Sequence, residues 1–318
     1  MALNLQLSKK DLNRVSIKKH ACSAAYRLAR GLILTGLAFL ILYPLFVKIS
    51  ASLMSTSDTY NASVVFLPKA PTLSNFITAW EAVDYPLTFL KTLALSLSVG
   101  VLQVISCTLV AYGLAKFSFY GRRLILGLVI FTLVIPTQTI LTPLYIRFRF
   151  FNVAQLIQVG GELSGVSMIN TILPILLLSL TATAFKNGLY IFILVQHFRN
   201  SPKVLEEAAL IDGCSRFSTF TRIAVPGAIP MLVTVFLFSF VWQWTDFYYS
   251  SVLMPEMDFL ATKLLDVKFS WIAGIEGDLS ASVSYAPRLL LLILPLAILY
   301  CFTQRFFVES VERSGIVG

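Results

Sequence analysis

The side chains that could carry out chemistry are few, and their spacing matches no hydrolytic or metal-dependent centre. The chain has two histidines, His20 and His197, which are too far apart for an HExxH zinc motif. It contains neither the GxSxG pattern of serine hydrolases nor the GxxxxGK[ST] loop that holds nucleotide phosphates. Its four cysteines form no CxxC pair, and we expect them to be free structural thiols. We therefore expect a chain that is not an enzyme, with no catalytic residue, metal or cofactor of its own.

A second group of side chains suits binding. Aromatic faces and hydrogen-bonding groups gather at the end of one apolar run, at Trp242, Gln243, Trp244, Asp246 and Tyr248. Such a mixture suits a sugar ring, whereas Trp and Tyr also form the ordinary aromatic belts of membrane interfaces. Asp246 should face protein, water or a solute, because a carboxylate in hydrocarbon costs about 2.5–3.5 kcal/mol on insertion scales. Gln138, beside Pro136, is a further candidate, although it could simply satisfy backbone groups at a proline bend.

The elements that carry these residues are long and apolar. Of 318 residues, 57% are apolar and only 13% are charged, whereas soluble domains have about 25% charged residues. A membrane-spanning helix needs about 20 apolar residues, and six runs qualify: 31–53, 92–115, 124–146, 163–185, 223–245 and 286–304. A shorter run, 187–198, is predicted to be a bent continuation of the fourth helix towards the membrane surface. We predict an all-α membrane protein with six transmembrane helices in residues 31–318, after a basic N-terminal tail over residues 1–30.

The cationic residues set the orientation of these spans. Six crossings place both termini on one side, and 17 of the 25 Lys and Arg residues lie on that side, including Lys186 directly after the fourth run. Lys and Arg accumulate in cytoplasmic segments, so both termini are predicted to be cytoplasmic. The net charge of +9 is thereby explained without nucleic acid. The longest outer segments, 54–86 and 250–287, could dock an external protein or be solvated loops.

A cytoplasmic loop at about 199–225 joins the fourth and fifth spans and predicts a short helix. Ser201 suits the N-cap, Pro202 the first helical position, and Gly213 the left-handed position after the helix ends. Glu206 and Glu207 lie near the positive end of its dipole.

The same short helix has an apolar stripe. Val204, Ala208 and Ile211 recur at helical spacing, on a helix too short to be stable alone. It needs a partner surface, which could be another protein or the lipid interface.

This loop resembles the cytoplasmic EAA loop of binding-protein-dependent ABC importer permeases. The motif residues are Glu207, Ala208, Ala209, Gly213, Ile223 and Pro226, with Val225 where Leu is usual. Residues 111–117, Ile135-Pro136, Ile211-Asp212 and 242–247 are also similar to carbohydrate-type permeases, including the smaller permease of maltose importers. The resemblance covers nearly the whole chain after the basic tail.

The resemblance implies a function and a set of partners. The loop would act as a coupling helix that docks on a separate ATPase subunit, through Glu206, Glu207, Ala208, Ala209, Asp212, Gly213, Ile223 and Pro226. ATP and Mg would bind to that partner, and this chain would bind no cofactor. A second permease in a heterodimer, two ATP-binding subunits and an extracellular solute-binding protein would complete an importer of a carbohydrate, expected to be an oligosaccharide. It would lie in a bacterial or archaeal cytoplasmic membrane.

Two other classes of membrane protein are alternatives to an importer permease. A secondary transporter acting alone predicts intramembrane ion ligands and an internal repeat, and the sequence shows neither clearly. A purely structural membrane scaffold would leave the loop motif without a reason.

Overall fold

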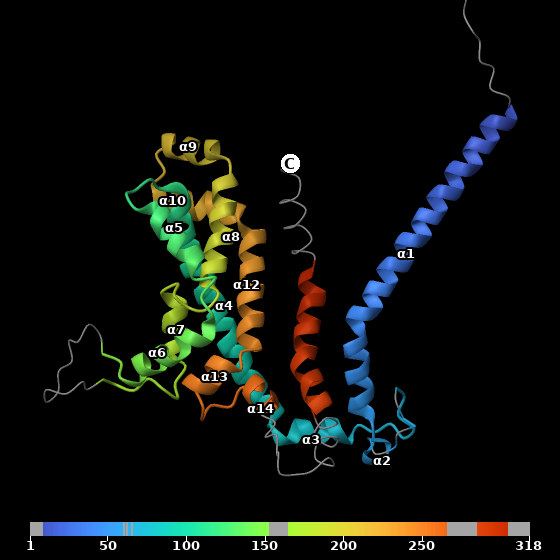
Figure 1. Ribbon diagram of the computed structural model, residues 1–318. Coiled ribbons are helices and arrows are strands. Elements are labelled where there is room, and N and C mark those ends of the chain that lie inside the picture. Colours follow the sequence, from blue (N-terminus) through green and yellow to red (C-terminus); the bar gives the residue numbers. More distant parts are fainter. Residues whose placement is uncertain are drawn as a thin grey trace, which may run out of the picture. The chain divides into compact units, whose positions relative to one another are not determined.

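The computed structural model describes residues 9–59, 61, 63–64, 66–152, 165–265 and 285–304 (Figure 1). Within these ranges the regular elements are helices, and the β-structure is limited to one isolated antiparallel bridge between Phe151 and Val166. The all-α fold class is therefore confirmed for the described residues. Residues 1–8 of the predicted tail and residues 266–284 of the predicted outer loop lie outside them. The chain divides into two compact units, which are described in turn: Met1–Asn75 with Gly274–Pro287, and Phe76–Ala273 with Arg288–Gly318.

The first unit is built on α1 (Lys9–Leu53), which contains Pro44 and is followed by α2 (Thr56–Thr59). The large apolar side chains of α1 between residues 26 and 46 are exposed, as expected of a helix that faces lipid. The Asn75 amide nitrogen donates to the carbonyl oxygens of Ser52 and Met54 at 3.1 and 2.8 Å. It thus satisfies acceptors at the end of α1, where the helix has no internal donors left. Asn75 lies in α3 (Ser74–Ala82), which continues into the second unit.

The second unit is organised around α4 (Tyr85–Lys116), a helix of 32 residues. Two other helices, α8 (Asn187–Asn200) and α12 (Ile229–Trp244), pack along it (Figure 1). Small residues allow the close approach that helices need in lipid, where no hydrophobic effect drives them together. At Gly100, for example, an added Cβ would lie only 2.9 Å from the ring of Phe236 on α12.

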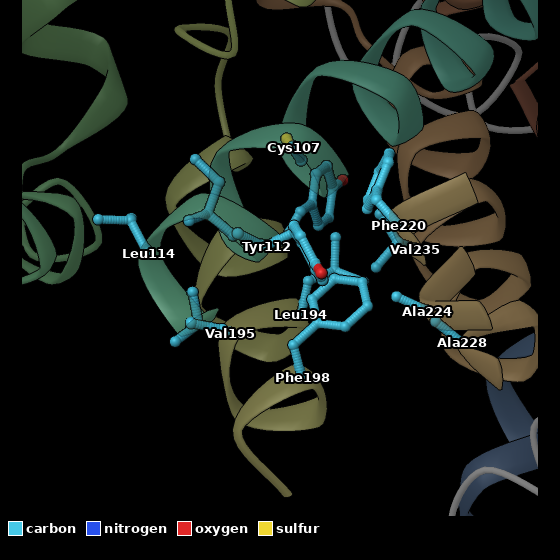
Figure 2. Close-up of a cluster of buried hydrophobic side chains, with 14 residues drawn as sticks. Cys107, Tyr112, Leu114, Leu194, Val195, Phe198, Phe220, Ala224, Ala228 and Val235 are labelled. Carbon is cyan, nitrogen blue, oxygen red and sulfur yellow. The ribbon is translucent and has the colours of Figure 1, made fainter. Parts of the chain in front are cut away.

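The buried cluster that joins these helices is drawn in Figure 2. It draws on α4, on α8 and on the segment leading into α12, with Cys107, Tyr112, Leu114, Leu194, Val195, Phe198, Phe220, Ala224, Ala228 and Val235 among its members. The run 187–198, which we predicted to continue a span towards the membrane surface, therefore packs within the core. Cys107 is a free thiol, as are Cys214 and Cys301, in agreement with the predicted absence of disulfides at these described positions.

The C-terminal helix, Tyr285–Gln304, packs on the other end of α4 and α12 through residues of the second unit. The Tyr85 hydroxyl donates to the Leu291 carbonyl oxygen at 2.9 Å, and the Trp244 indole nitrogen donates to the Leu292 carbonyl oxygen at 3.1 Å. The short helices α13 (Tyr248–Leu253) and α14 (Leu260–Leu265) lie in the same unit.

Three described helices are long and apolar enough to cross a membrane: Tyr26–Leu53, Tyr85–Lys116 and Tyr285–Gln304. They confirm three of the predicted spans as single helices, at 31–53, 92–115 and 286–304. The predicted fifth span, 223–245, was expected to be one helix, but the chain bends by 76° between Arg216–Gly227 and Ile229–Trp244. The first part of this pair consists of α10 (Arg216–Thr219), the π-helix η2 (Phe220–Ala224) and α11 (Val225–Gly227). Pro226 and Pro230 flank the bend and remove backbone donors there.

The third and fourth predicted spans are not continuous helices. The run 124–146 is divided into α5 (Arg122–Phe131) and α6 (Thr137–Arg149), separated by a turn that ends at Pro136. In the run 163–185, the described helix is α7 (Leu173–Leu180), only eight residues long. Six residues follow before α8, and two of them, Ala182 and Lys186, have positive φ angles, which interrupt a helical backbone. The six-span topology therefore stays a prediction.

Close helix packing yields a test at Gly188, at the start of α8. An added Cβ would lie 2.9 Å from the Val129 carbonyl oxygen of α5 and still closer to the Thr132 hydroxyl. We expect Gly188→Ala to lower stability by about 1–3 kcal/mol, because the backbone of α5 has to move. The measurement is the thermal unfolding midpoint of the purified protein. Gly113→Ala in α4 is the matched control, since nothing lies within 4 Å of its added Cβ. Equal midpoints for the two variants would contradict this account of the packing.

Candidate functional site

The loop singled out by the sequence forms α9 (Lys203–Ile211), at one end of the second unit (Figure 1). Gly213 has a φ of +87°, the left-handed conformation predicted for it. The Gly213 N–H donates to the Leu210 carbonyl at 3.2 Å and the Cys214 N–H to the Ala209 carbonyl at 2.9 Å. These two bonds are the Schellman ending of a helix.

The predicted start of α9 is wrong by about one residue. Ser201 closes α8, where its N–H donates to the His197 carbonyl at 3.1 Å, and Pro202 occupies the N-cap position without a side-chain hydrogen bond. Ser201 is thus the last capping residue of α8, and the first helical residue of α9 is Lys203.

One face of α9 is exposed and apolar. Val204, Leu205 and Ile211 are 72%, 59% and 85% exposed, and no part of the described chain covers them. Ala208 is exposed between them, while Ala209 is buried towards the rest of the unit. The predicted apolar stripe is therefore present on the open side of the helix, and Glu207 and Asp212 are also exposed there.

Glu206 points the other way. Its carboxylate forms an ion pair with Lys116, with 2.7 Å between Oε1 and Nζ, and both side chains are largely buried. The Tyr112 hydroxyl donates to Oε2 at 3.2 Å. We predicted that Glu206 contacts a partner together with Glu207, but its carboxylate is used inside the chain. It attaches α9 to the end of α4.

The remaining motif residues lie beyond α9. Ile223 is half-buried in η2, and Pro226 is exposed in α11, on the bent segment before α12. They shape the connection between α9 and α12 and are not part of the exposed face of α9.

A separate pocket of about 410 Å³ opens among α4, α6, α7, α8, α12 and α13. Five of the six predicted binding residues line it: Gln138, Trp242, Gln243, Asp246 and Tyr248. The structure thus brings Gln138, which is remote in sequence, to the residues at the end of α12.

Trp244 does not line the pocket, contrary to our prediction. Its ring is buried, it packs on Phe240, and its indole nitrogen donates to the Leu292 carbonyl. Trp242 and Trp244 are two residues apart, so they lie on opposite sides of a helix with 3.6 residues per turn.

Asp246 has three hydrogen bonds within the chain. It accepts from the Tyr249 N–H at 3.2 Å, and from the Ser250 N–H and hydroxyl, both at 2.8 Å. These donors belong to the first turn of α13, where backbone N–H groups have no helical partner. The carboxylate therefore faces protein, as expected, and stabilises the start of α13.

Several pocket residues were missed by reasoning from the sequence. Lys186 lines the pocket, with its Nζ 4.3 Å from the centre of the Trp242 ring. Phe185 stacks on Tyr249 with ring centres 3.5 Å apart. We had assigned Lys186 to a cytoplasmic loop, but the 14 residues of α8 separate it from that loop. The sequence signal that could have identified Lys186 as a pocket residue is its position as a single cation between two apolar runs, 163–185 and 187–198.

Comparisons with known proteins agree with this architecture. The chain is 29% identical over 279 residues to a putative ABC transporter permease of Caldicellulosiruptor sp., covering 86% of this chain and 91% of that protein. It is 26% identical over 285 residues to an arabinooligosaccharides transport system permease of Halalkalibacterium halodurans, covering 89% and 93%.

A chain of a solved bacterial ABC transporter involved in the import of the acidic polysaccharide alginate has the same fold, with a TM-score of 0.68. It is 20% identical, and the match covers 90% of this chain and 98% of that one. Residues 107–312 match the model of one family over more than half of the chain. The chain accordingly belongs to the family of binding-protein-dependent transport system inner membrane components, the permeases of ABC importers.

Proposed function

We propose that this chain is one of two permease subunits that form the pathway of an ATP-driven oligosaccharide importer. It would cross the membrane six times, with both termini cytoplasmic, and receive its solute from an external binding protein. The observation that carries the proposal is α9, a short helix whose apolar face is open and whose opposite side is ion-paired to α4. The arabinooligosaccharide permease among its relatives supports the solute class.

In this proposal, α9 is the surface that docks on a separate ATPase subunit. Val204, Leu205 and Ile211 would insert into an apolar groove of that subunit, since burying a large aliphatic side chain contributes about 1.5–3 kcal/mol. Exposed Glu207 is available for a charge-assisted hydrogen bond to a basic partner residue. ATP and Mg would bind to the partner.

The attachment of α9 to α4 would transmit the movement of the ATPase subunits to the membrane helices. When two ATPase subunits close on ATP, each would carry its docked helix with it. The Glu206 to Lys116 ion pair and the Tyr112 hydrogen bond would pass this displacement to α4. Because α4 also contributes Val99 and Gln103 to the pocket, its movement would change access to that pocket.

The pocket is the proposed solute site. Trp242 is half-exposed there and offers an aromatic face to a sugar ring, while Gln138, Gln243 and Tyr248 supply hydrogen-bonding groups. A second permease would complete the pathway.

The docking surface is tested with Ile211→Glu. We expect at least a tenfold loss of ATPase subunit recovered with the permease, because a carboxylate would be buried in an apolar groove. The measurement is co-purification from membranes, followed by solute uptake. Leu67→Glu is the control, since Leu67 is also exposed (83%) but lies in the predicted outer segment 54–86, outside α9 and outside the predicted spans. Normal ATPase recovery with Ile211→Glu would refute α9 as the docking surface.

The transmission step is tested at the buried ion pair. Breaking such a pair by removing one partner costs about 3–5 kcal/mol, because the other charge is left buried. We expect Glu206→Gln and Lys116→Met each to reduce uptake per ATP hydrolysed, and the charge exchange Glu206→Lys with Lys116→Glu to restore part of it. Uptake and ATP hydrolysis are measured together in proteoliposomes. Single variants that transport as efficiently as the wild type would exclude this pair from the coupling.

The two tryptophans provide a matched test of the solute site. Trp242→Ala should raise the KM for uptake with little change in thermal stability. Trp244→Ala should instead lower stability by about 3–5 kcal/mol, because it leaves a cavity in the core. Uptake kinetics and unfolding midpoints distinguish the two. An unchanged KM in Trp242→Ala would argue for a role in the membrane interface only.

A further inference from the structure

Lys186 is an unusual cation for its place in the fold. It lies between α7 and α8, with a φ of 70° at the start of α8, and lines the same pocket as Gln243. An ionisable residue between apolar membrane helices is costly and is generally kept for a function. Its ammonium group contacts the Trp242 ring at 4.3 Å, a cation–π interaction that leaves other N–H donors free.

The carboxylate that shares the pocket does not neutralise Lys186 by direct contact. Among the described residues, the ion pairs closer than 4.0 Å are Lys116 with Glu206 and Lys263 with Asp258. The Asp246 oxygens are instead used by the three donors at the start of α13. The charged acceptor of the pocket is thus occupied, while its charged donor has no carboxylate partner in the described chain.

A second donor lies in the same pocket. The Gln243 amide nitrogen is buried and has no hydrogen-bond partner among the described residues. A buried donor left unsatisfied costs about 1–3 kcal/mol, so a ligand acceptor at this point would be favoured. Lys186 and Gln243 therefore leave the pocket with unmatched donors.

We infer that the pocket recognises a carboxylate-bearing sugar, with Lys186 as the residue that binds the carboxylate and Gln243 as a supporting donor. The inference rests on the proposed import of an oligosaccharide and narrows its solute to acidic oligosaccharides. An ammonium-to-carboxylate hydrogen bond is about twice as strong as one between neutral groups, so it distinguishes an acidic sugar from its neutral counterpart.

The test is equilibrium binding of a matched pair of sugars to the permease–ATPase complex in nanodiscs, without the external binding protein. The pair is a tri-galacturonate and the same trisaccharide after reduction of its carboxyl groups to alcohols. We expect the wild type to bind the acidic member more tightly and Lys186→Met to lower the acidic-to-neutral affinity ratio about tenfold. Lys186→Arg should retain most of the preference, because it keeps the cation.

The control is Lys91→Met, which removes a cation from an exposed position of α4 outside the pocket and should leave the ratio unchanged. Nanodiscs of phosphatidylcholine alone keep anionic lipid headgroups out of the pocket, and the preference should persist in them. The rate of ATP hydrolysis reports assembly, and Lys186→Gln serves in place of Lys186→Met if the latter fails to assemble.

Three results would overturn the inference: no acidic preference in the wild type, an unchanged ratio in the Lys186 variants, or no binding of either sugar. Failure of the proposed function is separate. It would appear as an absence of ATP-dependent uptake of any oligosaccharide by the complete wild-type transporter.

Discussion

The packing of α4 against α8 and α12 is the interaction on which both sites of this protein depend. One end of α4 carries Lys116 and Tyr112, which hold α9, and its middle carries Val99 and Gln103, which line the pocket. At 1.5 Å per residue, its 32 residues extend about 48 Å. A close-packed helix moves as one body, so the docking surface and the pocket share a single rigid element.

Polar residues of α4 and its neighbours make the broken helices possible. The Ser106 hydroxyl donates to the Ser179 carbonyl near the end of α7 at 2.6 Å, and the Thr92 hydroxyl accepts from the Leu260 N–H at the start of α14 at 2.8 Å. Helix ends leave backbone groups without partners, and hydrocarbon supplies none. Short helices can therefore be buried in this unit because neighbouring side chains provide the missing hydrogen bonds.

The two candidate sites differ in what they leave unsatisfied. On α9, apolar surface remains uncovered: Val204, Leu205 and Ile211 are exposed. Glu206, on the opposite side of the helix, is ion-paired with Lys116. In the pocket, hydrogen-bond donors of Lys186 and Gln243 lack acceptors among the described residues. An open apolar face suits a protein surface, whereas free donors beside an aromatic ring suit a small polar solute.

Much could be predicted from the sequence where the physics is local. Composition determined a helical membrane protein, and the periodicity of Val204, Ala208 and Ile211 with Gly213 determined a short helix with an open apolar face. Only the tertiary structure decided that the runs 124–146 and 163–185 are not continuous helices. A count of apolar residues does not report the backbone conformation, which is non-helical at Pro136 and Lys186. It also decided which way each side chain points. Glu206 pairs with Lys116, 90 positions earlier in the chain, and the Lys186 ammonium group contacts the Trp242 ring of α12. Both contacts depend on how distant segments pack together, so no local sequence pattern predicts them.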